Sequence, residues 1–215
     1  MNLVIDGLII LSLFLLFGVS HSIFASNKIK FWMIRKFGIK IAFYRLFYNL
    51  SSLAIFYIFY ALSPKPDVII YDLQPPFDIL VVILQALSLA GLIWASTSID
   101  VGEFIGIGQI QRYFKGTYKI EELDENLTFI VGGAFKYSRH PIYFFSMLFL
   151  GFRPEMDFFY FTFIILSIIY FNVGSYFEEK KLIERFGVRY LKYQKIVPKL
   201  IPYKATKSDL AKEEI

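Results

Sequence analysis

Apolar residues run in five stretches along the chain, separated by polar and charged segments. The stretches are Leu3–Val19, Phe43–Leu62, Ile79–Ala95, Ile142–Phe152 and Phe158–Phe177. A membrane-spanning helix needs about 20 apolar residues, whereas the fourth stretch would extend only about 17 Å in a hydrocarbon core about 30 Å thick. The pattern predicts an all-α integral membrane protein with about five transmembrane helices. Because Gly, Arg and Pro interrupt residues 151–155, we expect the fourth and fifth helices to form a helical hairpin.

Composition agrees with a membrane location. Of the 215 residues, 56% are hydrophobic and 19% are charged, whereas a soluble domain has about 45–50% and about 25%. We therefore expect one membrane domain over residues 1–215. The chain has no cysteine, which excludes disulfides, Cys-ligated metals and a cysteine nucleophile. With only His21 and His140 as histidines, we expect no metal site.

The basic residues predict the orientation. All 23 of them except Lys65 and Arg153 fall within 28–45, 112–139 and 180–212. By the positive-inside rule, the N-terminus is then outside and the C-terminus is cytoplasmic. Residues 98–141 form an inside-facing loop, and residues 178–215 form an inside-facing amphipathic helix and tail. The net charge of +5 favours contact with membrane lipids, and no nucleic-acid-binding motif accompanies it.

A first polar cluster, Tyr137–Tyr143, precedes the fourth stretch. Pro141 is typical of the first turn of a helix, which places Arg139 and His140 at the inside boundary of the membrane. A helix N-terminus beside an arginine attracts carboxylates and phosphates. Alternatively, Arg139 reaches lipid phosphates and Tyr143 belongs to an interfacial aromatic belt.

A second cluster follows the fifth stretch. Glu178 and Glu179 lie at the membrane boundary, where an unpaired carboxylate is costly. Alternatively, they pair with Lys181 or Arg185 along a surface helix. The amphipathic face of the C-terminal helix is expected from residues repeating at three- and four-residue intervals: Leu182, Phe186, Tyr190 and Tyr193.

Two weaker clusters are His21-Ser22 at the end of the first stretch and Asp100–Gln109 after the third. A lone histidine is more often an interfacial residue than a ligand, and the glycines near Asp100 do not follow a strand as a dinucleotide site requires. By the predicted topology, all four clusters lie on the inside face. This placement favours one pocket with cationic, anionic and aromatic walls.

The two main clusters together resemble the isoprenylcysteine carboxyl methyltransferase and phospholipid methyltransferase superfamily. The first block of the resemblance is Tyr137-x-Arg139-His140-Pro141-x-Tyr143. The second is Glu178-Glu179-x-x-Leu182-x-x-x-Phe186-Gly187-x-x-Tyr190-x-x-Tyr193-x-x-x-Val197-Pro198. The methanethiol S-methyltransferase branch looks closest, on the basis of His21, Ser22, Ala25, Ser98, Asp100, Phe104, Gly106 and Gln109.

The resemblance implies an enzyme that uses S-adenosyl-L-methionine at the cytosolic face. By position, the residues implied to line the cofactor pocket are Tyr137, Arg139, His140, Tyr143, Glu178, Glu179 and Tyr190. Of these, His140 and Glu179 are the expected catalytic residues. The superfamily often has glycine where this chain has Phe145. This departure argues against close helix packing at that position and against a lipid entrance like that of the superfamily.

The residues are compatible with this cofactor. Arg139 could hold its carboxylate, Glu178 or Glu179 its ammonium or ribose hydroxyls, and tyrosine rings its sulfonium. If the acceptor must lose a proton, His140 or His21 is the candidate base.

We therefore predict methyl transfer to a small thiol such as methanethiol. The alternatives are methylation of an isoprenyl-cysteine carboxylate or a lipid amine, and a non-catalytic membrane protein with the same fold. A transporter is disfavoured because Ile79–Ala95 and Phe158–Phe177 contain no charged residue.

Overall fold

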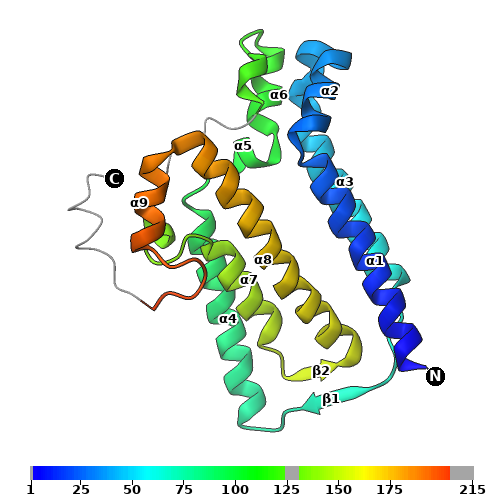
Figure 1. The fold of residues 1–215 in the computed structure, drawn as a ribbon. Helices are drawn as coiled ribbons and strands as arrows, with labels where there is room; N and C mark the ends of the chain where they lie inside the picture. Colours follow the sequence, from blue (N-terminus) through cyan, green and yellow to red (C-terminus); the bar gives the residue numbers. More distant parts are fainter. Residues whose placement is uncertain (1, 124–130, 204–215) are drawn as a thin grey trace. The chain divides into compact units, whose positions relative to one another are not determined.

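A computed structural model describes residues 2–123 and 131–203, and the chain divides into two compact units (Figure 1). One unit consists of Met1–Pro66 and Asp100–Thr128, and the other of Asp67–Ile99 and Phe129–Ile215. Each unit thus combines two stretches that are separated in the sequence.

The first unit is helical throughout its described elements. These are α1 Leu3–Phe24, α2 Asn27–Phe37, η1 Gly38–Phe43, α3 Tyr44–Leu62, α5 Val101–Ile105, α6 Ile107–Phe114 and η2 Ile120–Glu122. Asn2 and Ser26 begin α1 and α2, because each side chain accepts a hydrogen bond from a first-turn backbone N–H. Helices α1 and α3 lie side by side (Figure 1), and the rings of Phe14 and Phe59 meet edge to face at 5.6 Å. Apolar packing therefore joins α1 to α3.

The second unit contains the remaining helices and one short strand pair. Its elements are β1 Ile69–Asp72, α4 Phe77–Ser96, η3 Gly133–Lys136, α7 Pro141–Gly151, β2 Glu155–Asp157, α8 Phe158–Phe186 and α9 Val188–Ile196. Strands β1 and β2 are antiparallel, with Ile69 opposite Asp157 and Asp72 opposite Glu155. The pair joins the segment before α4 to the turn between α7 and α8, and α7 packs against both α4 and α8.

The predicted fold class, an all-α membrane protein, is confirmed. Four described helical stretches are long and apolar enough to cross a membrane: Leu3–Phe24, Asn27–Leu62, Phe77–Ser96 and Phe158–Phe186. The fourth predicted stretch is helix α7, which has only 11 residues. The chain is thus a multi-pass membrane protein, while a fifth span and a hairpin of α7 with α8 stay predictions.

The C-terminal helix differs from the prediction of one continuous amphipathic element. Helix α8 continues through Glu178 and Glu179 to Phe186, and α9 begins directly after Gly187. Gly187 has a φ of +56°, a conformation that favours glycine and ends α8. The predicted face is therefore divided between two helices, and its four residues meet across the turn in one apolar cluster that also includes Val197: Leu182, Phe186, Tyr190 and Tyr193.

Helices α4 and α7 approach closely at Gly91. A Cβ atom built on Gly91 would lie 2.3 Å from the ring of Phe145, so the ring occupies the space of the missing side chain. Trp94 lies on the same helix as Gly91, and its ring centroid is 6.4 Å from that of Phe145. A glycine on α4 thus accommodates the bulky residue at position 145, and the two helices remain in close contact.

Candidate functional site

The backbone just before α7 is bonded to the segment that follows α9. The N–H groups of Arg139 and His140 donate to the carbonyl oxygens of Pro198 and Lys199 at 2.9 and 3.0 Å. The hydroxyl of Ser138 donates to the same Lys199 oxygen at 3.1 Å. Because Pro141 starts α7, these bonds fix Arg139 and His140 at the entrance of that helix.

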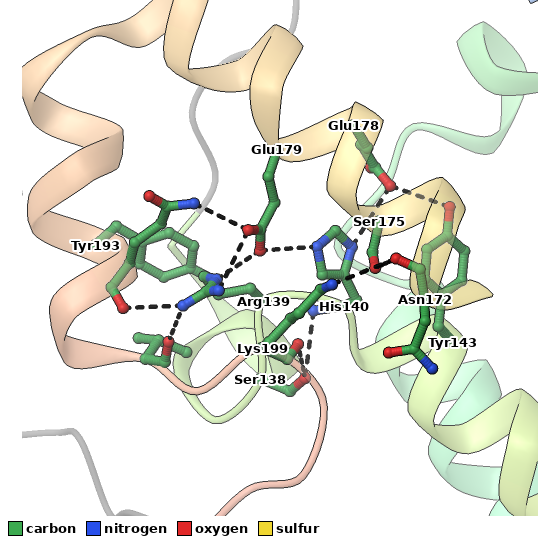
Figure 2. Close-up of polar contacts among 12 residues, drawn as sticks. Ser138, Arg139, His140, Tyr143, Asn172, Ser175, Glu178, Glu179, Tyr193 and Lys199 are labelled. Carbon is green, nitrogen blue, oxygen red and sulfur yellow. Dashed lines mark hydrogen bonds and ion pairs between the residues drawn. The ribbon is translucent and has the colours of Figure 1, made fainter. Parts of the chain in front are cut away.

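Arg139 clamps α8 to the end of α9 (Figure 2). Its Nε and Nη2 donate to Glu179 Oε1 and Oε2 at 2.7 and 3.3 Å. Its Nη1 donates to the carbonyl oxygens of Gln194 and Val197 at 2.9 and 2.8 Å. The side chains of Arg139 and Glu179 are only 11% and 12% exposed. All three nitrogens of the guanidinium therefore donate hydrogen bonds within the protein.

His140 lies between two carboxylates (Figure 2). Its Nε2 is 3.1 Å from Glu179 Oε1, and its Nδ1 is 3.4 Å from Glu178 Oε2. Burial of the ring lowers the pKa of His140, but the contacts with Glu178 and Glu179 outweigh burial, so the pKa lies above its ordinary value. A ring nitrogen that faces a carboxylate carries a proton, and His140 is therefore suited to the imidazolium form.

Glu178 and Glu179 are neighbours in α8, but their surroundings differ. Glu179 accepts from Arg139 and His140, and the Gln194 amide donates to its Oε2 at 2.9 Å. Glu178 is 48% exposed, and its Oε2 accepts from the Tyr143 hydroxyl at 3.0 Å. Its exposure leaves Glu178 accessible to a ligand, whereas the carboxylate of Glu179 is occupied by the protein.

Three aromatic rings stack beside Glu178. The rings of His140 and Tyr143 are parallel within 3°, with centroids 5.3 Å apart. The rings of Tyr143 and Phe171 are parallel within 11° at 4.9 Å. A flat aromatic surface next to a carboxylate can hold an organic cation or a planar heterocycle.

The tyrosines of α9 are packing residues. Tyr190 and Tyr193 are each 2% exposed, and the Tyr193 hydroxyl donates to the Phe135 carbonyl at 2.6 Å. Burial raises the pKa of both tyrosines, and the Glu179 carboxylate adds to this for Tyr190. Of the residues implied to line a cofactor pocket, Tyr190 thus lies in the apolar cluster formed by α8 and α9. Tyr137 contacts α4, with its ring centroid 6.1 Å from that of Trp94.

Several site residues were not among those singled out in the sequence. The Gln194 amide donates to Glu179, and the Ser138 hydroxyl accepts from the His140 backbone N–H. Lys199 Nζ donates to the Asn172 carbonyl at 3.4 Å. Ser138 lies within the first motif, and this position was the only indication in the sequence that it belongs to the site. Lys199 takes part mainly through its backbone carbonyl, and such contacts leave no trace in residue type.

The predicted pairing of Glu179 along its own helix is not what positions it. Its bonds lead to Arg139, His140 and Gln194, which lie outside α8. Arg139, in turn, is directed to protein groups rather than to lipid phosphates. The first and second clusters of the sequence therefore come together in the second unit.

His21, the third cluster, belongs to the first unit. Its Nδ1 is 2.9 Å from the Ser52 hydroxyl, and its Nε2 is 2.6 Å from the Tyr48 hydroxyl. Both contacts join α1 to α3. Hydroxyl groups can serve either ring nitrogen of a neutral histidine, because they both donate and accept.

The fourth cluster has partners of its own in the first unit. Both carboxylate oxygens of Glu103 accept from Arg112, and Asp100 caps α5 through the Glu103 N–H at 3.0 Å. Gly106 has a φ of +101°, and a Cβ there would lie 2.7 Å from the Leu46 backbone nitrogen.

The predicted pocket formed by all four clusters stays a prediction. Among the described residues, no group of His, Asp and Glu could hold a metal ion.

Comparisons with curated proteins find relatives along most of the chain. Methanethiol S-methyltransferase 1 of Bradyrhizobium diazoefficiens is 31% identical over 90% of this chain and 66% of its own length. Methanethiol S-methyltransferase of Crocosphaera subtropica is 30% identical over 96% of this chain and 79% of its own length. The enzyme of that name from Pseudomonas deceptionensis is 28% identical over 87% and 69%. The chain thus spans slightly under two thirds of the first relative. No family model and no solved structure matches it.

Proposed function

The chain belongs to the methanethiol S-methyltransferase family, and on this premise we propose that it transfers the methyl group of S-adenosyl-L-methionine to methanethiol. Membership confirms the predicted resemblance to the methanethiol S-methyltransferase branch and makes the chain a methyltransferase. The observation that supports the proposal for the site is the cluster in which His140 joins the exposed carboxylate of Glu178 to the enclosed one of Glu179, beside a stack of aromatic rings.

The residues present fit this cofactor. When bound, S-adenosyl-L-methionine would supply an electrophilic methyl carbon: a thiolate, formed by loss of the thiol proton to water, would attack that carbon in line, and S-adenosyl-L-homocysteine would leave as the carbon–sulfonium bond breaks. Glu178, 48% exposed, is suited to bind an ammonium group or ribose hydroxyls. The stack of His140, Tyr143 and Phe171 beside Glu178 is suited to border a cation or adenine.

Arg139 and Glu179 have a positioning role in this proposal. Their mutual bonds and those to Gln194 and Val197 hold α8 and α9 together, so Glu178 keeps a fixed orientation. His140 extends the same function, because its imidazolium contacts Glu178 and Glu179 at once. We therefore assign His140 and Glu179 to positioning rather than to proton removal. Such preorganisation is the main contribution a protein makes to a displacement of this kind.

We also propose the orientation and the hairpin predicted above. The concentration of lysine and arginine in 28–45, 112–139 and 180–212 supports a cytoplasmic C-terminus and an N-terminus outside. The hairpin is supported by the short length of α7 and by its contact with α8, which follows after β2. A helix of 11 residues that pairs with its successor need not cross the whole hydrocarbon core.

The experiment that tests the function measures methyl transfer from labelled S-adenosyl-L-methionine by the purified protein in detergent. The acceptors are methanethiol, a farnesyl-cysteine analogue and phosphatidylethanolamine, and dimethyl sulfide is read from the headspace. We expect label in dimethyl sulfide alone. Label in either of the other acceptors would replace methanethiol as the substrate, and absence of both transfer and cofactor binding would favour a non-catalytic membrane protein.

A pair of variants tests the site. Glu178→Gln keeps the side-chain size but removes the exposed charge, so we expect the dissociation constant for S-adenosyl-L-methionine to rise by about tenfold or more. Glu184→Gln is the matched control, because Glu184 is exposed on the same helix and outside the cluster. Equal affinities of E178Q and E184Q would remove Glu178 from the binding site.

A further inference from the structure

Helix α2 exposes a face that mixes cations with large aromatic side chains. Residues Lys28, Phe31, Trp32, Arg35 and Lys36 are exposed, and their three- and four-residue spacing places them on one side of the helix. Phe31 is 60% exposed and Trp32 is 50% exposed. Lys36 Nζ lies 5.0 Å from the centroid of the Trp32 ring. This face therefore presents positive charge and aromatic surface together.

The opposite face of α2 is fixed to the first unit. Ile29, Met33 and Ile34 pack against the buried cluster that contains Ile41 and Tyr44. The exposed face is therefore held in one orientation. The sequence around α2 carries positive charge only, because five lysines or arginines occur at positions 28–40 and no aspartate or glutamate occurs at positions 7–66.

The connections of α2 place it at the membrane boundary. Only residues 25 and 26 separate it from α1, and η1 leads from it directly into α3. Helix α1 has one charged side chain of Asp, Glu, Lys or Arg in 22 residues and α3 has one in 19, whereas α2 carries four lysines or arginines in 11 residues. A segment of this kind between two membrane helices lies where head groups meet the hydrocarbon core.

We propose that this face of α2 is a binding surface for anionic phospholipids. Phosphates of the lipid head groups contact Lys28, Arg35 and Lys36, while Phe31 and Trp32 enter the boundary between head groups and acyl chains. The charge of this face supports the choice of ligand, because a surface rich in cations is complementary to an anionic leaflet. This inference concerns the first unit and does not depend on the proposed methyl transfer.

Trp32 provides a direct probe, because the chain has only two tryptophans. The variant Trp94→Phe is placed in nanodiscs of equal phosphatidylglycerol and phosphatidylcholine, with brominated acyl chains on one lipid or on the other. We expect Trp32 fluorescence to be quenched more strongly by the brominated anionic lipid, which corresponds to a local enrichment of about two- to fivefold. The preference should fall toward unity at high salt, since salt screens exposed charges.

Matched variants make the result specific. Lys28→Gln, Arg35→Gln and Lys36→Gln together should abolish the preference, whereas Lys180→Gln, Lys192→Gln and Lys195→Gln, which remove the same charge from α8 and α9, should retain it. Trp32→Phe leaves Trp94, which lies against Tyr137 and Phe145 and should show no preference. Equal quenching by both brominated lipids would overturn the proposal. Absence of quenching by either lipid would also do so, because water or another protein surface would then cover this face.

Discussion

The two histidines of this chain lie in two contrasting regions. In the second unit, His140 lies between the carboxylates of Glu178 and Glu179 and is 4% exposed on its side chain. In the first unit, His21 lies between the hydroxyls of Tyr48 and Ser52. Hydroxyls satisfy a neutral ring, whereas paired carboxylates favour a charged one.

The difference concerns what each network costs and what it can bind. Removing charges from water is expensive, so a cluster of one guanidinium, one imidazolium and two carboxylates is stable only while every member has its partners. A network of hydroxyls around His21 carries no such cost and joins only α1 to α3. Charged clusters of this kind are typical of binding sites, which supports placing the proposed site in the second unit.

The largest effect is expected from breaking the charged cluster at Arg139. Arg139→Ala leaves Glu179 largely buried without its guanidinium and frees the carbonyls of Gln194 and Val197. We expect a loss of about 3–5 kcal/mol in the free energy of unfolding, together with loss of cofactor binding. Chemical denaturation in detergent measures the first effect. Arg185→Ala on the exposed surface of α8 is the control, and equal stability of the two variants would contradict the clamp.

Glu179→Gln sharpens the contrast between the neighbouring carboxylates. The amide keeps the size of Glu179 but loses charge-assisted bonds to Arg139 and His140, so we expect a cost of about 2–3 kcal/mol. Glu178→Gln should cost at most about 1 kcal/mol, because Glu178 is half exposed. The same denaturation experiment compares them. If E178Q were the more damaging to stability, the division of labour between the two residues would be reversed.

The third prediction concerns pH. Because the pKa of His140 is higher in the folded protein than its ordinary value, its protonated form stabilises the fold at low pH. This stabilisation is complete below the ordinary pKa and is lost as the pH rises through the raised value. The difference in unfolding temperature between the wild type and His140→Gln should therefore be largest below about pH 6 and should narrow as the pH rises above that. A constant difference would mean that the imidazolium contributes nothing.

The smallest effect is expected in the hydroxyl network. Tyr48→Phe removes one hydrogen bond to His21, at a cost of about 0.5–1.5 kcal/mol. Tyr57→Phe on the exposed surface of the same helix should have almost no effect, because Tyr57 is 68% exposed. Thermal unfolding of both variants provides the measurement. A Y48F loss as large as that of R139A would erase the contrast between the two regions.

The sequence predicts the membrane helices well because burial in lipid requires long apolar runs. The stretches Phe43–Leu62 and Ile79–Ala95 agree with α3 and α4 within two residues at each end. The end of α8 was less predictable: polar residues after Phe177 continue the helix because Glu179 is stabilised by groups outside it. The β1–β2 pair consists of backbone bonds between distant segments, which residue types do not reveal.

The candidate site could be predicted in part. Arg139, His140, Glu178 and Glu179 stand in two recognisable motifs, and the structure brings them together. Their division into exposed and enclosed groups depends on α9 folding back after Gly187, which no spacing in the sequence indicates.

The bonds between the start of α7 and the end of α9 impose an order on biosynthesis. They join residues that are 58 and 61 positions apart, from Arg139 to Val197 and from Ser138 to Lys199. On the ribosome, α7 and α8 are therefore complete before the last partners of Arg139 have been translated. A nascent chain arrested before Gln194 contains the four long apolar helical stretches of the described residues but lacks the last partners of Arg139. The network around Arg139 therefore closes only after these helices have been synthesised.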